Sequence, residues 1–124
     1  MSRKSAAALT FALALAACED GAPEQNRTVM RVANPHSDQL KGMTPLYRNL
    51  GLRRAILDSN QRCKNVVAAA YQEDHKNMAM WTARCSDTGE FAIFIAGTGD
   101  VQVRQCRHAE TLGLPACRPL PAKS

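Results

Sequence analysis

Apolar residues between positions 45 and 59 recur at the spacing of an amphipathic helix. Thr44 is placed to cap this helix, and Pro45 suits its first turn. Gly51 weakens the helix by up to ~1 kcal/mol relative to alanine. We expect the helix to span residues 45–59. Its broad apolar face is expected to bury Leu46, Tyr47, Leu50, Leu52, Ile56 and Leu57. The charged residues between them are expected to face solvent: Arg48, Arg53, Arg54 and Asp58.

Beyond Cys63 the pattern changes to short extended runs separated by turn residues. The runs cover residues 65–72, 78–85, 91–96 and 101–106, and the third is apolar on both faces, which predicts a central strand. The connections at 73–77, 87–89 and 97–100 are short, and short connections require antiparallel neighbours. The predicted fold class is therefore α+β, with one N-terminal amphipathic helix packed on a four-strand antiparallel meander. The alternative is a three-strand sheet in which the alanines at 68–70 are partly helical.

Four cysteines fall in this region: Cys63, Cys85, Cys106 and Cys117. If the first hairpin turns near Asp74, Cys63 lies opposite Cys85, at a separation that a disulfide can bridge. Cys106 and Cys117 then close a short loop of their own. The leading alternative pairs Cys85 with Cys106. A zinc site is disfavoured because the cysteines lack the C-x2–4-C spacing of zinc ligands, and no metal or other cofactor is expected.

The first residues have the layout of an export signal. Arg3 and Lys4 form a basic start, and residues 6–17 are uncharged. This run is too short to cross the ~30 Å hydrocarbon core of a bilayer as a helix. It ends in Leu15-Ala16-Ala17-Cys18, which resembles the lipobox of bacterial lipoproteins.

The resemblance implies that the chain is cleaved before Cys18, that the Cys18 thiol receives a diacylglycerol, and that a further acyl chain such as palmitate is added to the new amine. Two or more acyl chains are needed for stable anchoring. The implied partner is membrane lipid, held through the acylated N-terminus, with the domain facing the oxidising periplasm of a bacterial envelope. Glu19 and Asp20 leave the choice between inner and outer membrane open.

Four segments follow from these patterns. Residues 1–17 are the signal peptide, 18–43 a flexible linker rich in turn residues, 44–117 the small domain, and 118–124 a proline-rich, disordered tail. The formal net charge of +5 becomes +3 once Arg3 and Lys4 are removed. Nucleic acid is not an expected partner, because acidic and basic residues are interspersed.

Few residues suggest chemistry, and no catalytic set is predicted. The three histidines, His36, His75 and His108, are expected to be exposed to solvent. Trp81 is expected to pack between sheet and helix, with ligand stacking as the alternative. A candidate docking patch for an anionic partner or headgroup combines Trp81 with three arginines, against the alternative of a solvated helix face. These arginines are Arg48, Arg53 and Arg54.

From Thr44 to Cys117 the chain is also similar to small lipoprotein domains of Gram-negative envelopes. The shared features are a helix ending at residues 55–59, Cys63, and the segment 80–85. Such domains have no assigned activity to transfer. We therefore expect a lipid-anchored, non-enzymatic accessory or interaction module with an envelope protein as partner. The alternatives are a periplasmic protein that binds a small ligand or peptide and, behind it, a small hydrolytic enzyme.

Overall fold

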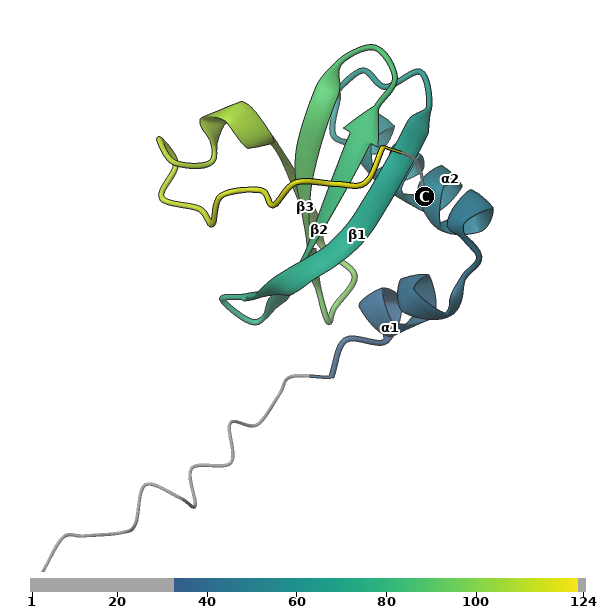
Figure 1. Cartoon of the computed structure of the whole chain (residues 1–124). Helices are drawn as coiled ribbons and strands as arrows, with labels where there is room; N and C mark the ends of the chain where they lie inside the picture. Colours follow the sequence, from purple (N-terminus) through teal and green to yellow (C-terminus); the bar gives the residue numbers. More distant parts are fainter. Residues whose placement is uncertain (1–32, 123–124) are drawn as a thin grey trace, which may run out of the picture. The chain divides into compact units, whose positions relative to one another are not determined.

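The computed structural model describes residues 33–122 (Figure 1). The predicted signal peptide, the lipobox-like stretch at residues 15–18 and the predicted linker as far as residue 32 lie outside the described residues. In chain order the elements are α1 (Pro35–Gly42), α2 (Pro45–Asp58), β1 (Val66–His75), β2 (Met78–Cys85), β3 (Gly89–Ala96), β4 (Val101–Gln105) and the single 3-10 turn η2 (Cys106–His108). The strands form one antiparallel sheet in the order β1-β2-β3-β4. The α+β class and the four-strand meander are therefore confirmed, and the alanines at 68–70 belong to β1.

The first hairpin differs from the predicted register. Its turn is formed by Lys76 and Asn77, with φ of 48° and 63°, as a two-residue turn between right-twisted strands requires. Val66, not Cys63, lies opposite Cys85, and β1 has two register shifts along its length. These irregularities insert extra residues into β1, and an apolar pattern alone does not locate them.

Both predicted disulfides are nevertheless present. Cys63 bonds to Cys85 and Cys106 bonds to Cys117, with Cα–Cα separations of 5.4 and 5.7 Å. The first bridge forms because the chain before β1 continues alongside the end of β2, where Ser86 N–H donates to the Asn65 carbonyl at 2.8 Å. The correct pairing thus arises from a geometry other than the one assumed in its prediction.

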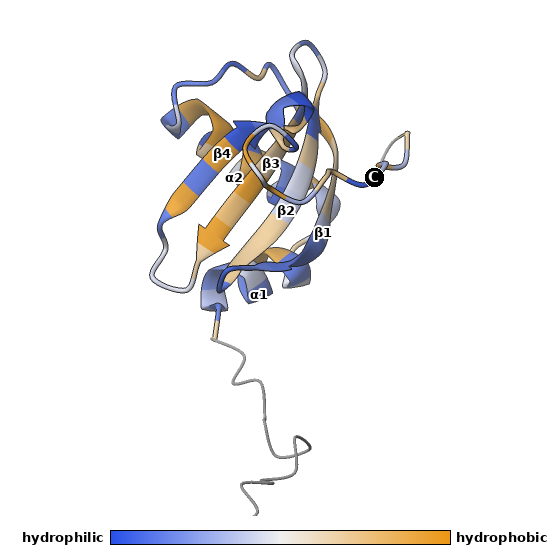
Figure 2. Ribbon diagram, turned by 90° about the vertical axis from the view of Figure 1, so that its left-hand side faces the viewer, coloured by the Kyte–Doolittle hydropathy of each residue, from blue (hydrophilic) through white to orange (hydrophobic). Residues whose placement is uncertain are grey.

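The main core lies between the sheet and α2. Leu52 and Ile56 of α2 are buried against side chains on one face of the sheet. These sheet residues include Ala69, Trp81, Ala83, Phe91, Ile93, Ile95 and Val103. Figure 2 shows the strongest hydropathy in β3, as expected for the central, doubly covered strand.

The opposite face of the sheet is covered by the C-terminal segment. Met80, Ala92 and Phe94 form a second buried cluster, against which Leu114 and the Cys106–Cys117 bridge pack. After this bridge the chain runs back across β2 and β1 (Figure 1). The tail predicted to be disordered is therefore wrong for residues 118–122, which lie along the sheet. Residues 123–124 lie outside the described part of the chain.

Contacts through the backbone explain how a proline-rich tail is held. Arg84 donates from its guanidinium to the carbonyls of Leu120 at 3.2 Å and Pro121 at 3.1 Å. Proline has no N–H to pair with a strand, but its carbonyl remains a full acceptor. A basic side chain on the sheet can therefore fasten a segment that has no strand pattern of its own.

The predicted linker 18–43 is also corrected, because its last part forms α1. The Asn34 side chain caps this helix by accepting from Ser37 N–H at 3.1 Å, and it donates to the Ile95 carbonyl at 2.7 Å. Ser37 is 1% exposed and accepts a hydrogen bond from the Trp81 indole at 2.9 Å. The domain thus has two helices before its sheet, and polar contacts fix the first of them.

Candidate functional site

The structure does not bring the predicted docking patch together. Trp81 is 1% exposed, with its indole N–H donated to Ser37 and its ring edge-on to Tyr71 at a centroid distance of 5.9 Å. It is a core residue, as the main expectation held, and it cannot stack on an incoming ligand. Its inclusion in the docking patch was wrong.

Two of the three arginines serve the fold. Arg48 donates from Nε to the Leu40 carbonyl and from Nη2 to the Met43 carbonyl, both at 3.0 Å. It therefore adds a second donor to the Leu40 carbonyl, which also accepts from Met43 N–H, and it pairs the Met43 carbonyl just beyond α1. Its guanidinium also lies 5.7 Å from the centroid of the Trp81 ring.

Arg53 supports the segment before β1. Its Nε lies 3.0 Å from the Cys63 carbonyl and 2.8 Å from the Lys64 carbonyl, next to the first disulfide. The third arginine, Arg54, is exposed and pairs with Asp58 at 3.0 Å, with side chains 78% and 62% exposed. All three arginines were expected to face solvent. Arg48 instead donates to carbonyls at the end of α1, and Arg53 donates to carbonyls in the segment before β1.

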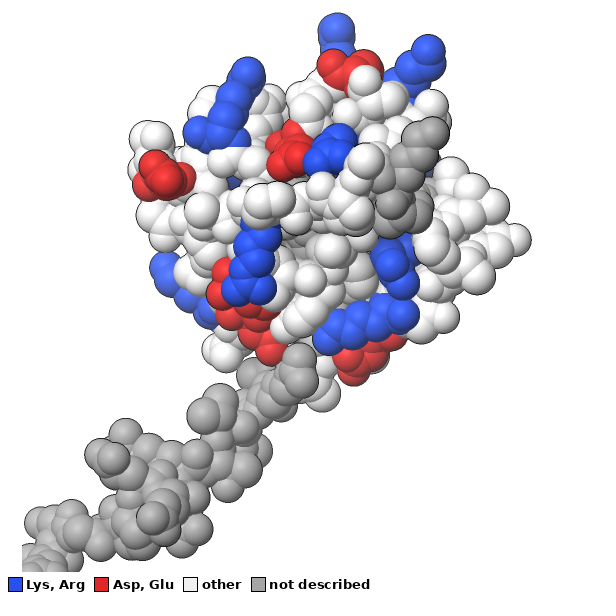
Figure 3. All heavy atoms as spheres, viewed as in Figure 1, with Lys and Arg blue, Asp and Glu red and all other residues white. Residues whose placement is uncertain are grey.

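Leucines and a tyrosine occupy the surface that the arginines were expected to cover. Leu46 is 66% exposed, Tyr47 64%, Leu50 53% and Leu57 36%. These four residues of α2 are named the α2 outer face. The prediction had placed all four in the core, and for them it was wrong. In Figure 3 the right-hand edge of the molecule, where α2 begins, is mostly uncharged, with basic side chains next to it.

The helix is rotated relative to the prediction because it has two apolar stripes. Leu46, Leu50 and Leu57 follow one line along the helix, and Leu52 with Ile56 follow another, about a third of a turn away. Neighbouring contacts decide which stripe turns inward. Gly51 lies close to α1, where a Cβ would be 3.5 Å from Leu40 Cδ2. This is an ordinary contact distance, and together with the bonds that Arg48 makes to the end of α1 it shows that α1 lies against α2 here.

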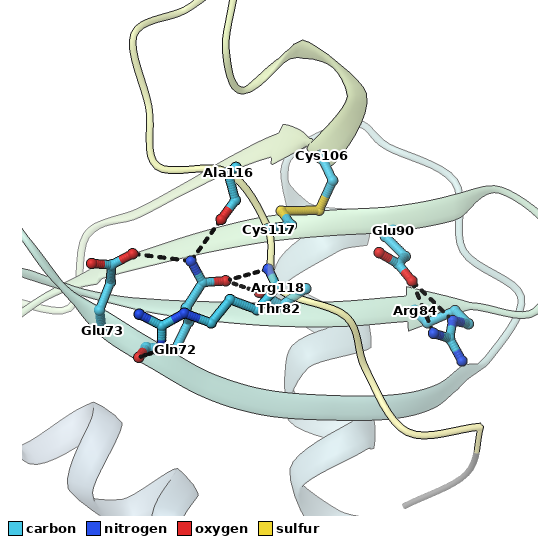
Figure 4. Close-up of a disulfide and its surroundings, with 9 residues drawn as sticks. All are labelled: Gln72, Glu73, Thr82, Arg84, Glu90, Cys106, Ala116, Cys117 and Arg118. Atoms are coloured by element: carbon cyan, nitrogen blue, oxygen red, sulfur yellow. Dashed lines mark hydrogen bonds and ion pairs between the residues drawn. A yellow bond between two sulfur atoms is a disulfide. The ribbon is translucent and has the colours of Figure 1, made fainter.

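A polar cluster centred on Gln72 lies on the other face of the sheet (Figure 4). The Gln72 amide donates to the Ala116 carbonyl at 2.8 Å. Its Oε1 accepts from Thr82 Oγ1 at 3.0 Å and from Arg118 N–H at 2.9 Å. The amide is therefore occupied by contacts that hold the C-terminal segment, and sequence reasoning missed it because Gln72 carries no motif.

Beside the Gln72 cluster, a salt bridge between two partly exposed side chains also serves the fold. Arg84 contacts Glu90 at 3.0 Å, with both side chains about 30% exposed. Glu90 also lines a hollow of about 320 Å³ at the end of the sheet. The other lining residues are Thr88, Gly89, Gln105, Cys106 and Arg107. Glu90 is paired with Arg84, and Thr88 Oγ1 donates to the Arg62 carbonyl, so two of the polar lining side chains serve the fold.

The histidines lie in three separate places. His36 and His108 are exposed, as expected, whereas His75 is half-buried with its ring 5.8 Å from that of Phe94. The Nε2 of His75 is buried without a hydrogen-bond partner among the described residues. Within residues 33–122 no three side chains of His, Cys, Asp or Glu are grouped so that they could hold a metal ion.

No helix in the described part of the chain combines the length and apolar character needed to cross a bilayer. Comparisons with protein-family models, with curated proteins and with solved structures give no match. Four of the six large hydrophobic side chains that are exposed among the described residues belong to the α2 outer face, which makes this face the candidate interaction surface.

Proposed function

We propose that this chain is a lipid-anchored lipoprotein of the bacterial envelope, with Cys18 as the lipid attachment site. In this proposal the domain is a non-enzymatic accessory or interaction module that faces the periplasm. The observation that carries the proposal is the sequence Leu15-Ala16-Ala17-Cys18 at the end of a short apolar run with a basic start.

The pairing of the other cysteines supports a separate role for Cys18. The chain has five cysteines, and the four in the described residues bond to one another. None of those four thiols is left to bond to Cys18 within the same chain. Two disulfides in so small a domain are also typical of oxidising compartments outside the cytoplasm.

The surface supports a role in contact rather than in catalysis. Both faces of the sheet are covered, by α2 on one side and by the C-terminal segment on the other. The polar side chains with the most contacts, Gln72 and Arg84, are occupied by the fold. The α2 outer face has four of the six large hydrophobic side chains that are exposed among the described residues, and clustered exposed apolar residues mark interaction sites.

Intact mass analysis of the membrane-purified product tests the anchor. The expected product begins at Cys18 and carries the added mass of a diacylglycerol and an amide-linked acyl chain. Cys18→Ser should abolish both processing and lipid addition, so that the chain no longer partitions with detergent-solubilised membrane lipoproteins. Ala17→Gly is the matched control, since it keeps a small residue before the cleavage site and should be processed normally.

Retention of Met1, or an unmodified thiol at position 18 in the native product, would reject the anchor. Crosslinking of the membrane-anchored form followed by mass spectrometry tests the accessory role separately. It should recover the same envelope component in independent preparations. Failure to recover any reproducible component would count against an interaction module even if the anchor is present.

A further inference from the structure

The α2 outer face has no covering element among the described residues. We propose that it rests on the bilayer, with Leu46, Tyr47, Leu50 and Leu57 in the interfacial layer of a membrane containing anionic lipid. This inference depends on the proposed lipid anchor, and it assigns a surface and an orientation that the anchor alone does not define.

The composition of this face fits an interfacial helix. Leucines supply the apolar contact, and the tyrosine has a ring with a polar tip that suits the boundary between headgroups and acyl chains. Leu52 and Ile56, in the other stripe of the same helix, are no more than 1% exposed. The helix therefore has one apolar stripe in the core and a second one in solvent.

Charges at the C-terminal end of α2 favour anionic headgroups. Arg54 is exposed within this region, and Arg62 and Lys64 are exposed just beyond the helix. Lys64 stays near α2 because Arg53 binds its carbonyl. The acidic residues near this end of the helix are Asp58, which is paired with Arg54, and Asp87, whose carboxylate accepts from Lys64 N–H at 2.9 Å, so the three basic residues outnumber them. Basic residues near an anionic leaflet each favour binding, within a Debye length of the surface.

Because the proposed lipid anchor already holds the chain at the membrane, the α2 outer face needs only a weak affinity for the bilayer. About 15 residues separate Cys18 from Ala33, a length of chain that spans at most about 50 Å. The described domain then begins with α1, which packs on α2 where Leu40 meets Gly51. A surface held this close to the bilayer has a high effective concentration, so docking needs little intrinsic affinity.

The extent of the face argues against a second copy of the chain. Stable protein–protein interfaces involve roughly 20–30 residues on each side, whereas the α2 outer face has four large apolar residues. A tethered contact with lipid has no such size requirement. A protein occupant of the same surface is kept as an outcome of the test.

The test uses quenching of tryptophan by brominated acyl chains. The lipidated full-length mature protein is reconstituted into vesicles of phosphatidylcholine and phosphatidylglycerol, with Tyr47→Trp as the reporter. Leu112→Trp is the matched control, because Leu112 is 52% exposed in the segment closed by the second disulfide, on the other side of the sheet. Both variants share the buried Trp81, which supplies the same background in each.

We expect the tryptophan at position 47 to be quenched at least twofold more than the one at position 112. Adding Leu50→Asn to the Tyr47→Trp variant should reduce the excess quenching at position 47 by half or more. Adding Leu112→Asn to the same variant should leave the quenching at position 47 unchanged. The difference should also shrink in vesicles of phosphatidylcholine alone. Equal quenching of the two reporters, or stronger quenching at position 112, would overturn docking through this face.

Flotation with vesicles and intact mass are measured first, so that the two proposals can fail separately. Protein that is lipidated and floats, but shows no preferential quenching at position 47, retains the anchor and refutes the docking. Protein that carries no lipid refutes the anchor and the docking that depends on it. A photo-crosslink from position 47 to a protein, or to a second copy, in place of lipid also refutes the docking.

Discussion

The hydrogen bond between Ser37 and Trp81 offers a sharp test of how α1 is attached. Ser37→Ala removes the hydroxyl that accepts from the Trp81 indole at 2.9 Å, with both residues 1% exposed. Water cannot replace the lost partner without entering the core, so the indole N–H is left buried and unpaired. A buried, unpaired N–H of this kind lowers the free energy of unfolding by about 1–3 kcal/mol.

The assay is urea unfolding under oxidising conditions, followed by circular dichroism in every variant, because Trp81 is the only tryptophan of the chain and is itself replaced in the double-mutant cycle. Ser59→Ala is the matched control, because its hydroxyl also makes a hydrogen bond of 2.9 Å, to the Ala55 carbonyl, but at the end of a helix where the Ser59 backbone N–H also reaches that carbonyl. It should cost less than about 1 kcal/mol. Hydrogen exchange should also show faster opening of residues 35–42 in Ser37→Ala.

A double-mutant cycle with Trp81→Phe isolates the contact. In the phenylalanine background there is no indole N–H to leave unpaired, so Ser37→Ala should lose most of its effect and give a coupling free energy of about 1–2 kcal/mol. A cost below about 0.5 kcal/mol in the natural background, or an equal cost in both backgrounds, would refute the reasoning.

Three further substitutions test other parts of the fold by urea unfolding. Gln72→Ala should lower the free energy of unfolding by about 1–2 kcal/mol and expose the C-terminal segment to limited proteolysis, because that segment loses its amide anchor. Replacing Cys106 and Cys117 together with alanine should cost about 3 kcal/mol, the chain-entropy value for a loop of this length; no loss would mean that the unfolded chain is not restricted by it. Gly99→Ala should cost about 1–2 kcal/mol, since Gly99 has φ of 96° and a Cβ there would lie 3.2 Å from His36 Nε2; an unchanged midpoint would contradict this.

The sheet could be predicted from the sequence because its signals are local. Short connections between apolar runs dictate antiparallel neighbours, and the doubly apolar run at 91–96 marks the central strand. Extra residues in β1 could not be predicted, because an alternating pattern does not show where a strand gains an unpaired residue. The cysteine partners were nevertheless predicted correctly. The segment before β1 lies beside the end of β2, which brings Cys63 to Cys85, and Cys106 and Cys117 are the two that remain.

The parts that escaped prediction depend on single long-range contacts. The helix α1 has one apolar residue that packs on the core, Leu40, and is held by Asn34 and Ser37, which read as turn residues in the sequence. The orientation of α2 was ambiguous because it has two apolar stripes. For the candidate site, the arginines were identified, but their carbonyl partners lie in segments whose positions only the fold defines.

The attachment of α1 also determines where mechanical load enters the domain. Asn34 is bonded to the backbone of Ile95 in β3, and Ser37 to Trp81 in β2, so both contacts reach the two inner strands of the sheet. A pull transmitted along the chain through Ala33 therefore acts on the middle of the sheet, where neighbouring strands flank it on both sides. We therefore expect rupture under such a pull to begin with the detachment of α1 and not with the peeling of an edge strand.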